Sequence, residues 1–147
     1  MDNKRIAWVD DNINTQILKT YIDEFEDNGI EVVKIKTVEG LLENLKKELQ
    51  NSLSAILIDI IMPPGNYDDG KTRGGLRTGI PVLEDILKED LFKNIPIIVV
   101  TNVDDAEVTK FCETNAIPRL KKHDFFSDSF VIAVNEEIKK YNEKYLK

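Results

Sequence analysis

The sequence predicts an α/β fold in which a parallel β-sheet is covered by helices on both faces. Short apolar runs alternate with longer segments whose apolar residues recur at helical spacing, which is typical of strands joined by crossover helices. The apolar runs are nearly continuous, as expected for strands that are buried on both faces. Five such strand–helix units follow one another along the 147 residues, so we expect a single domain over 1–147.

The first two units lie in the first third of the chain. Residues 5–9 (RIAWV) form the first expected strand, and 31–36 (EVVKIK) form the second. Between them, one expected helix has apolar residues at Ile13, Ile17, Tyr21, Ile22 and Phe25, and Asn28-Gly29 ends it. The second helix has Leu41, Leu42, Leu45 and Leu49 on one face, and Thr37 is its expected N-cap.

The remaining units follow the strongest strand signal, AILIDII over 55–61. Residues 63–79 are rich in glycine and have no apolar periodicity, so we expect a long loop that is functional or mobile. The other expected elements are a helix over 80–89, a strand over 95–100, a helix capped by Asp104 or Asp105, a strand over 117–121 and a last helix from about Ser129.

Composition excludes some functions. The chain has 20 Lys and Arg against 27 Asp and Glu, a formal charge of −7, which disfavours direct contact with a nucleic-acid backbone. Its single cysteine, Cys112, cannot form an internal disulfide, and we find no secretory signal and no apolar run long enough to span a membrane. We therefore expect a protein of the cytoplasm that makes no direct contact with nucleic acid or membrane.

Acidic side chains follow two of the expected strands. Asp10 and Asp11 close the first strand, and Asp59 lies near the end of the third. In an open parallel sheet the ligand site lies beyond the carboxyl ends of the strands, where these carboxylates would converge and repel one another unless a cation compensates them. Mg²⁺, which prefers oxygen ligands and keeps several waters, suits such a site. Asp59 would then be free to act as a nucleophile toward phosphorus.

Two further strand ends carry groups suited to a phosphoryl anion. Thr101 follows the fourth strand and offers a hydroxyl donor, although it could merely cap the next helix. Lys121 or Lys122 follows the fifth strand and offers a fixed positive charge, although either could be a solvated surface residue.

Four motifs in this order resemble the receiver domain of two-component response regulators. They are the acidic pair of WVDDN, the Asp of LIDIIMPPG, the Thr of VVTN and the Lys of RLKKHDF. The resemblance covers nearly the whole chain and implies a flavodoxin-like, doubly wound (βα)5 fold with strand order 2-1-3-4-5. It also implies a phosphorylatable signalling switch that takes its phosphoryl group from a histidine kinase or a histidine phosphotransfer protein, with no enzymatic activity beyond self-phosphorylation and autodephosphorylation.

The resemblance implies a role for each matching residue. Asp59 would be the phosphoacceptor, Lys122 would contact the phosphoryl group, and Thr101 would move to hydrogen-bond it. The Mg²⁺ ligands would be Asp11, Asp59 and the backbone carbonyl of Ile61, with Asp10 acting mainly through water. Because the five units use nearly all of the chain, the output would pass through binding to an unknown downstream protein.

Two other hypotheses remain open. Asn102, Arg119 and His123 stand where the family usually has a small residue, an aromatic residue and a proline, and they favour a pseudo-receiver that binds partners without phosphorylation. A Mg²⁺-dependent phosphohydrolase with Asp59 as nucleophile is the third hypothesis. The haloacid dehalogenase type of that chemistry places a second Asp where this chain has Ile61.

Overall fold

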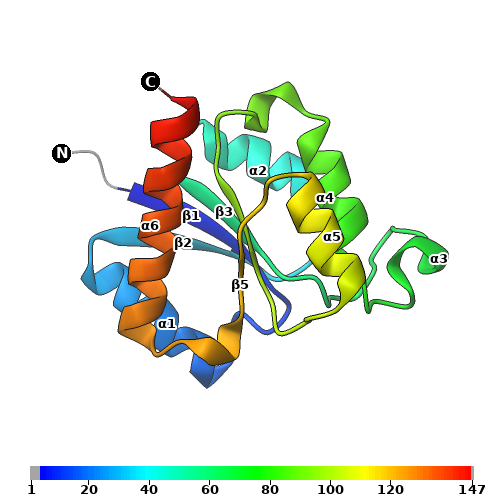
Figure 1. Ribbon diagram of the computed structural model, residues 1–147, viewed down its shortest axis with the longest axis horizontal. Coiled ribbons are helices and arrows are strands. Elements are labelled where there is room, and N and C mark those ends of the chain that lie inside the picture. The colour runs from blue at the N-terminus through cyan, green and yellow to red at the C-terminus, as the bar shows by residue number, and fades with distance from the viewer. Residues whose placement is uncertain (1–3, 147) are drawn as a thin grey trace.

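Five parallel strands form one sheet in the computed structural model of the chain, which describes residues 4–146 (Figure 1). They are β1 (Lys4–Val9), β2 (Ile30–Ile35), β3 (Ala55–Ile58), β4 (Ile97–Val100) and β5 (Arg119–Leu120). Their order is β2-β1-β3-β4-β5, which confirms the expected flavodoxin-like topology. The strands expected over 55–61, 95–100 and 117–121 are longer than β3, β4 and β5, because only single backbone groups beyond each strand, such as the carbonyls of Pro96 and Pro118, bond to a neighbouring strand.

Helices connect the strands and cover both faces of the sheet. The α-helices are α1 (Gln16–Asp27), α2 (Leu41–Leu49), α3 (Asp69–Thr72), α4 (Gly79–Leu87), α5 (Ala106–Thr114) and α6 (Ser127–Tyr145). Two short 3₁₀ turns, η1 (Asp90–Phe92) and η2 (Lys122–Asp124), precede β4 and α6. In the part of the chain that the structure describes, no helix is both long and apolar enough to cross a membrane.

The sheet separates two hydrophobic cores of different character. Helices α1 and α6 cover one face of the sheet (Figure 1). The rings of Trp8, Tyr21, Phe25 and Phe130 pack together there. Tyr21 stacks on Phe130 with ring centroids 5.0 Å apart. Helices α2, α4 and α5 cover the other face with aliphatic side chains. The central strands β3 and β4 and most of β1 are therefore buried on both faces, as the unbroken apolar runs predicted, whereas the edge strands β2 and β5 are partly exposed.

Two details of the expected helices are wrong. Thr37 does not cap α2, because Gly40 holds the cap position in a left-handed conformation (φ 67°) and the helix begins at Leu41. Ile17 is 70% exposed, because the buried stripe of α1 runs through Leu18 and Ile22, and Ile17 lies one residue outside that stripe. The expected cap Asp105 is correct, since its carboxylate accepts a hydrogen bond from the Val108 amide.

The segment over 63–79, which we call the insertion, was expected to be a loop throughout, but part of it is helical. It contains α3, which Asp68 caps, and it is fastened to the body of the domain at two places. Tyr67 donates a hydrogen bond to Asp85 of α4 at 2.6 Å. Arg77 forms ion pairs with Asp105 and Glu107 at the start of α5, and its Nε lies 2.9 Å from Glu107 Oε1. The insertion is thus held against the edge of the domain next to α5.

Candidate functional site

Two buried carboxylates lie together at the carboxyl edge of the sheet. The amide of Asp10 donates to the carbonyl of Ile35, and the amide of Asp59 donates to that of Val9, so both residues continue the parallel ladder by one step. Asp10 is fully buried and Asp59 is 5% exposed. The sequence reasoning placed both side chains at this edge, and the structure brings them together there.

Lys122 lies between these carboxylates. Its Nζ is 2.5 Å from Asp10 Oδ2 and 2.7 Å from Asp59 Oδ2. Burial by itself would lower the pKa of Lys122, but the two carboxylates outweigh it and raise that pKa. Burial and the charge of Asp59 raise the pKa of Asp10. Lys121 instead pairs with Asp104 on the surface, so the structure separates the two lysines that the sequence left as alternatives.

The chain that carries Lys122 is held by hydrogen bonds from two other elements. The hydroxyl of Tyr21, on α1, donates to the carbonyls of Lys122 and Phe125 at 3.1 and 2.9 Å. The His123 amide donates to Asn102 Oδ1 at 3.2 Å. Between residues 4 and 146 every peptide bond is trans, and Lys122 reaches the carboxylates in this arrangement. Tyr21 and Asn102 therefore position the lysine.

The surroundings of Asp59 restrict its orientation. Its Oδ1 accepts a hydrogen bond from the Ile60 amide at 2.7 Å, which leaves Oδ2 for Lys122. The start of α4 presses against this segment: a Cβ on Gly79 would lie 2.5 Å from the Asp59 carbonyl oxygen, so only glycine fits without a shift. Thr101, 1% exposed, follows the neighbouring strand β4 at the same edge, and its hydroxyl accepts from the Val103 amide at 3.2 Å.

The oxygen atoms available near the end of β1 and after β3 suit a divalent ion that keeps most of its water ligands. They are too few to surround an ion completely. Asp11 Oδ1 is buried and accepts no hydrogen bond from any described residue, which is a costly state for a carboxylate oxygen. No described residue donates to the Ile61 carbonyl either. Residues 4–146 contain no group of three or more His, Cys, Asp or Glu side chains arranged to hold a metal. A Mg²⁺ ion needs only one or two carboxylates and keeps its waters, so Asp11 and Ile61 suit it.

Tyr21 and Gly79 were missed as parts of the site when only the sequence was considered. Tyr21 was counted as one apolar position of a helix, and its hydroxyl carries no sequence signal for a contact with Lys122, about a hundred residues later along the chain. Gly79 was included in a glycine-rich loop. Gly79 directly precedes an apolar helical run. That position was the available signal, because a glycine at the start of a helix allows another segment of backbone to approach closely.

The fold is that of response regulator receiver domains, as comparison with solved structures shows. A receiver domain protein (CheY-like) from Methanospirillum hungatei is 23% identical, with 96% of this chain and 98% of that chain covered and a TM-score of 0.69. A receiver domain protein from Clostridium thermocellum is 23% identical over 98% and 99% of the two chains, with a TM-score of 0.68. The chemotaxis response regulator CheY4 of Vibrio cholerae is 18% identical over 92% and 98%, with a TM-score of 0.67.

These similarities establish the fold of the chain. No protein-family model matches the sequence, and no curated protein does. The chain thus has the receiver-domain fold.

Proposed function

We propose that the protein is a phosphorylatable signalling switch with Asp59 as the phosphoacceptor. The observation that carries the proposal is Lys122, whose ammonium group contacts both Asp10 and Asp59 at the carboxyl edge of the sheet. A buried lysine held between two carboxylates provides a fixed positive charge where phosphoryl oxygens would be added. The unsatisfied oxygen of Asp11, which follows Asp10 in the chain, supports a cation site at this end of β1.

The residues present account for the chemistry. Asp59 Oδ2 attacks the phosphorus of a phosphohistidine, a new O–P bond forms, and the P–N bond breaks with its electron pair left on the imidazole nitrogen. Lys122 balances the charge that the phosphoryl group brings. The Thr101 hydroxyl, which now accepts from the Val103 amide, can rotate to donate to a phosphoryl oxygen. Mg²⁺ held by Asp11, Asp59 and the Ile61 carbonyl, with Asp10 contributing through water, would neutralise further phosphoryl oxygens.

Intact-mass measurement after incubation with acetyl phosphate tests the proposal. With Mg²⁺ we expect one phosphoryl group per chain, and with a chelator we expect almost none. Asp59→Asn should abolish the adduct, whereas Asp23→Asn, an exposed carboxylate on α1, should leave it unchanged. An unmodified wild-type chain, or an adduct that survives Asp59→Asn, would contradict the proposal.

The partners follow from the same proposal. The phosphoryl donor in the cell would be a histidine kinase or a histidine phosphotransfer protein, in the cytoplasm. The output would be binding to a downstream protein, because phosphorylation adds charge and acceptor oxygens at an edge where loops can rearrange.

One observation favours a second candidate, a pseudo-receiver that binds partners without phosphorylation. Arg119, at the position where receivers usually carry an aromatic switch residue, donates to Thr109 at 2.7 Å and pairs with Asp104 at 3.4 Å. These contacts hold its side chain against α5. The pseudo-receiver gains support if Asp59→Asn leaves partner binding unchanged.

A further inference from the structure

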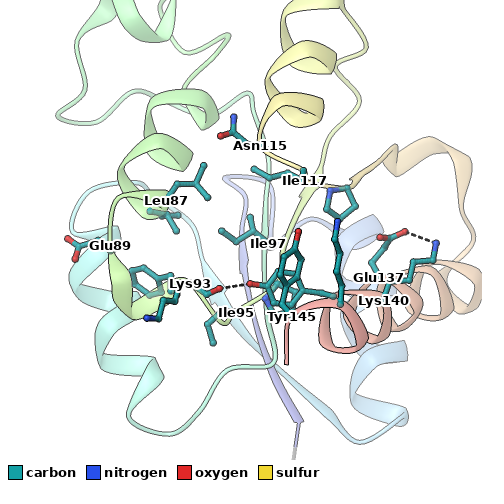
Figure 2. Close-up of a pocket in the computed structure, with 17 residues that line it drawn as sticks. Leu87, Glu89, Lys93, Ile95, Ile97, Asn115, Ile117, Glu137, Lys140 and Tyr145 are labelled. Atoms are coloured by element: carbon teal, nitrogen blue, oxygen red, sulfur yellow. Dashed lines mark hydrogen bonds and ion pairs between the residues drawn. The ribbon is translucent and has the colours of Figure 1, made fainter. Parts of the chain in front are cut away.

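A cavity of about 310 Å³ opens at the end of the domain opposite Asp59. It lies between the C-terminal parts of α4 and α6, the segment over 115–118 that follows α5, and the segment that contains η1 (Figure 2). Ile97, the first residue of β4, and Pro118, which precedes β5, line it, so it meets the amino ends of these strands. Asp59 and Thr101 follow the carboxyl ends, and the cavity is therefore a separate site.

The walls of the cavity are apolar and aromatic. Its inner wall includes the buried side chains of Ile86, Phe92, Ile97 and Ile117. Tyr141 and Tyr145 of α6 form the facing wall, with ring centroids 4.7 Å apart. The Tyr141 hydroxyl donates to the Lys93 carbonyl at 2.5 Å, which restrains that ring. A flat hydrophobic molecule would find stacking partners already in place.

The residues that line the cavity include more lysines than glutamates, so its rim has a positive charge. Both lining glutamates are already paired, Glu89 with Lys46 at 3.3 Å and Glu137 with Lys140 at 3.5 Å. Two further lining lysines, Lys93 and Lys144, have no carboxylate within ion-pair distance among residues 4–146.

Lys144 also stands 5.2 Å from the centre of the Tyr145 ring, beside the aromatic wall. Two ammonium groups that pair with no carboxylate among residues 4–146 favour an anion at this cavity, although the chain as a whole has a net charge of −7.

We propose that this cavity binds a small carboxylic acid with an aromatic body. Its volume lies at the lower end of the range of about 300–1,000 Å³ typical of small-molecule sites. A helix, with a diameter of about 10 Å including side chains, is too wide to enter a space of this size. The rings of the ligand would lie against Tyr145 and the inner wall, and its carboxylate would face Lys93 and Lys144.

A pair of probes of the same shape separates the two parts of the proposal. We would titrate the full chain with 2-naphthoate and with the uncharged 2-naphthylmethanol, following amide shifts by NMR and heats by calorimetry. We expect saturable binding of naphthoate, weaker binding of the alcohol, and shifts confined to residues around the cavity. Because the attraction is between exposed charges, the preference for naphthoate should shrink as salt is raised.

Variants assign each contribution. Replacing Lys93 and Lys144 together with Met should weaken naphthoate binding about fivefold and leave the alcohol unchanged. Tyr145→Ala should weaken both probes. Lys139→Met, a neighbouring lysine on α6 outside the cavity, is the matched control and should change neither. All three changes lie at exposed positions, so thermal unfolding should confirm intact folding.

Several results would overturn the proposal. The proposal fails if neither probe shows saturable binding, or if naphthoate and the alcohol bind with equal affinity. It also fails if naphthoate still binds with the wild-type affinity after both lysines are replaced, or if the NMR shifts centre on Asp59. Dimerisation of the chain through this face, seen by sedimentation, would also overturn it, because a second copy would then be the occupant. The Asp59→Asn variant should bind naphthoate like the wild type, which keeps this test independent of phosphorylation.

Discussion

Tyr21→Phe tests whether the hydroxyl of Tyr21 positions Lys122. The phenylalanine ring would still stack on Phe130. The change therefore removes only the hydroxyl group that donates to the carbonyls of Lys122 and Phe125. Two half-buried carbonyls would lose a donor, and we expect the free energy of unfolding to fall by about 1–2 kcal/mol. For a chain of this size the melting temperature should fall by roughly 2–8 °C.

The functional effect should exceed the effect on stability. Freed from Tyr21, the backbone at Lys122 would shift relative to Asp59, and we expect phosphorylation by acetyl phosphate to slow by about tenfold. Circular dichroism gives the melting temperature and intact mass gives the rate. Tyr67→Phe is the matched control, because it removes a hydroxyl bonded to Asp85 on the insertion and should leave the rate unchanged. Equal slowing in both variants, or an unchanged melting temperature in Tyr21→Phe, would refute the positioning role.

Three other predictions concern stability and reactivity. The pKa of Asp10 is raised by burial and by Asp59, so the folded state binds its proton more tightly and wild-type stability falls as the pH rises above the usual value of 3.8. In a metal-free buffer at neutral pH, Asp10→Asn should therefore raise the free energy of unfolding, because it removes a buried carboxylate that Asp59 repels, and a gain that persists in strong acid would contradict this cause. Gly79→Ala should destabilise the chain by about 1–3 kcal/mol in denaturant melts, because its Cβ would meet the Asp59 carbonyl, whereas Gly70→Ala, which meets only a side-chain oxygen, should cost less. Cys112 is 3% exposed and burial raises its pKa. An aromatic disulfide reagent should therefore react with it about a thousandfold more slowly in the native protein than in the unfolded chain. Rapid labelling of the native protein would show that α5 is not firmly packed.

The fold could be predicted well because local and long-range signals agree. Unbroken apolar runs marked the strands, and the resemblance supplied the order in which they pair, which no local pattern encodes. The start of α2 could not be predicted, since Gly40 adopts a left-handed conformation that depends on how the chain turns back onto the sheet. The exposure of Ile17 likewise depends on how α1 is rotated against its neighbours, which spacing alone defines only within about one residue.

The candidate site could be predicted where its residues follow strands. Asp10 and Asp59 were placed at one edge because parallel strands end together there, and the structure brings both side chains to Lys122. The supporting contacts could not be predicted in this way. Arg77 reaches Asp105 from the insertion, and Tyr21 reaches Lys122 from α1, and both contacts depend on three-dimensional packing between distant segments.

The aromatic core also determines what fluorescence can report. Trp8 is the only tryptophan of the chain, is fully buried, and lies in β1 two residues before Asp10. Its ring packs on the α1 and α6 side, away from α2, α4 and α5. Its emission is thus an intrinsic optical probe of one half of the domain. A response of Trp8 to Mg²⁺ or to a phosphoryl donor would register a change that has reached the aromatic layer, while movements confined to the insertion and α5 would leave the spectrum unchanged.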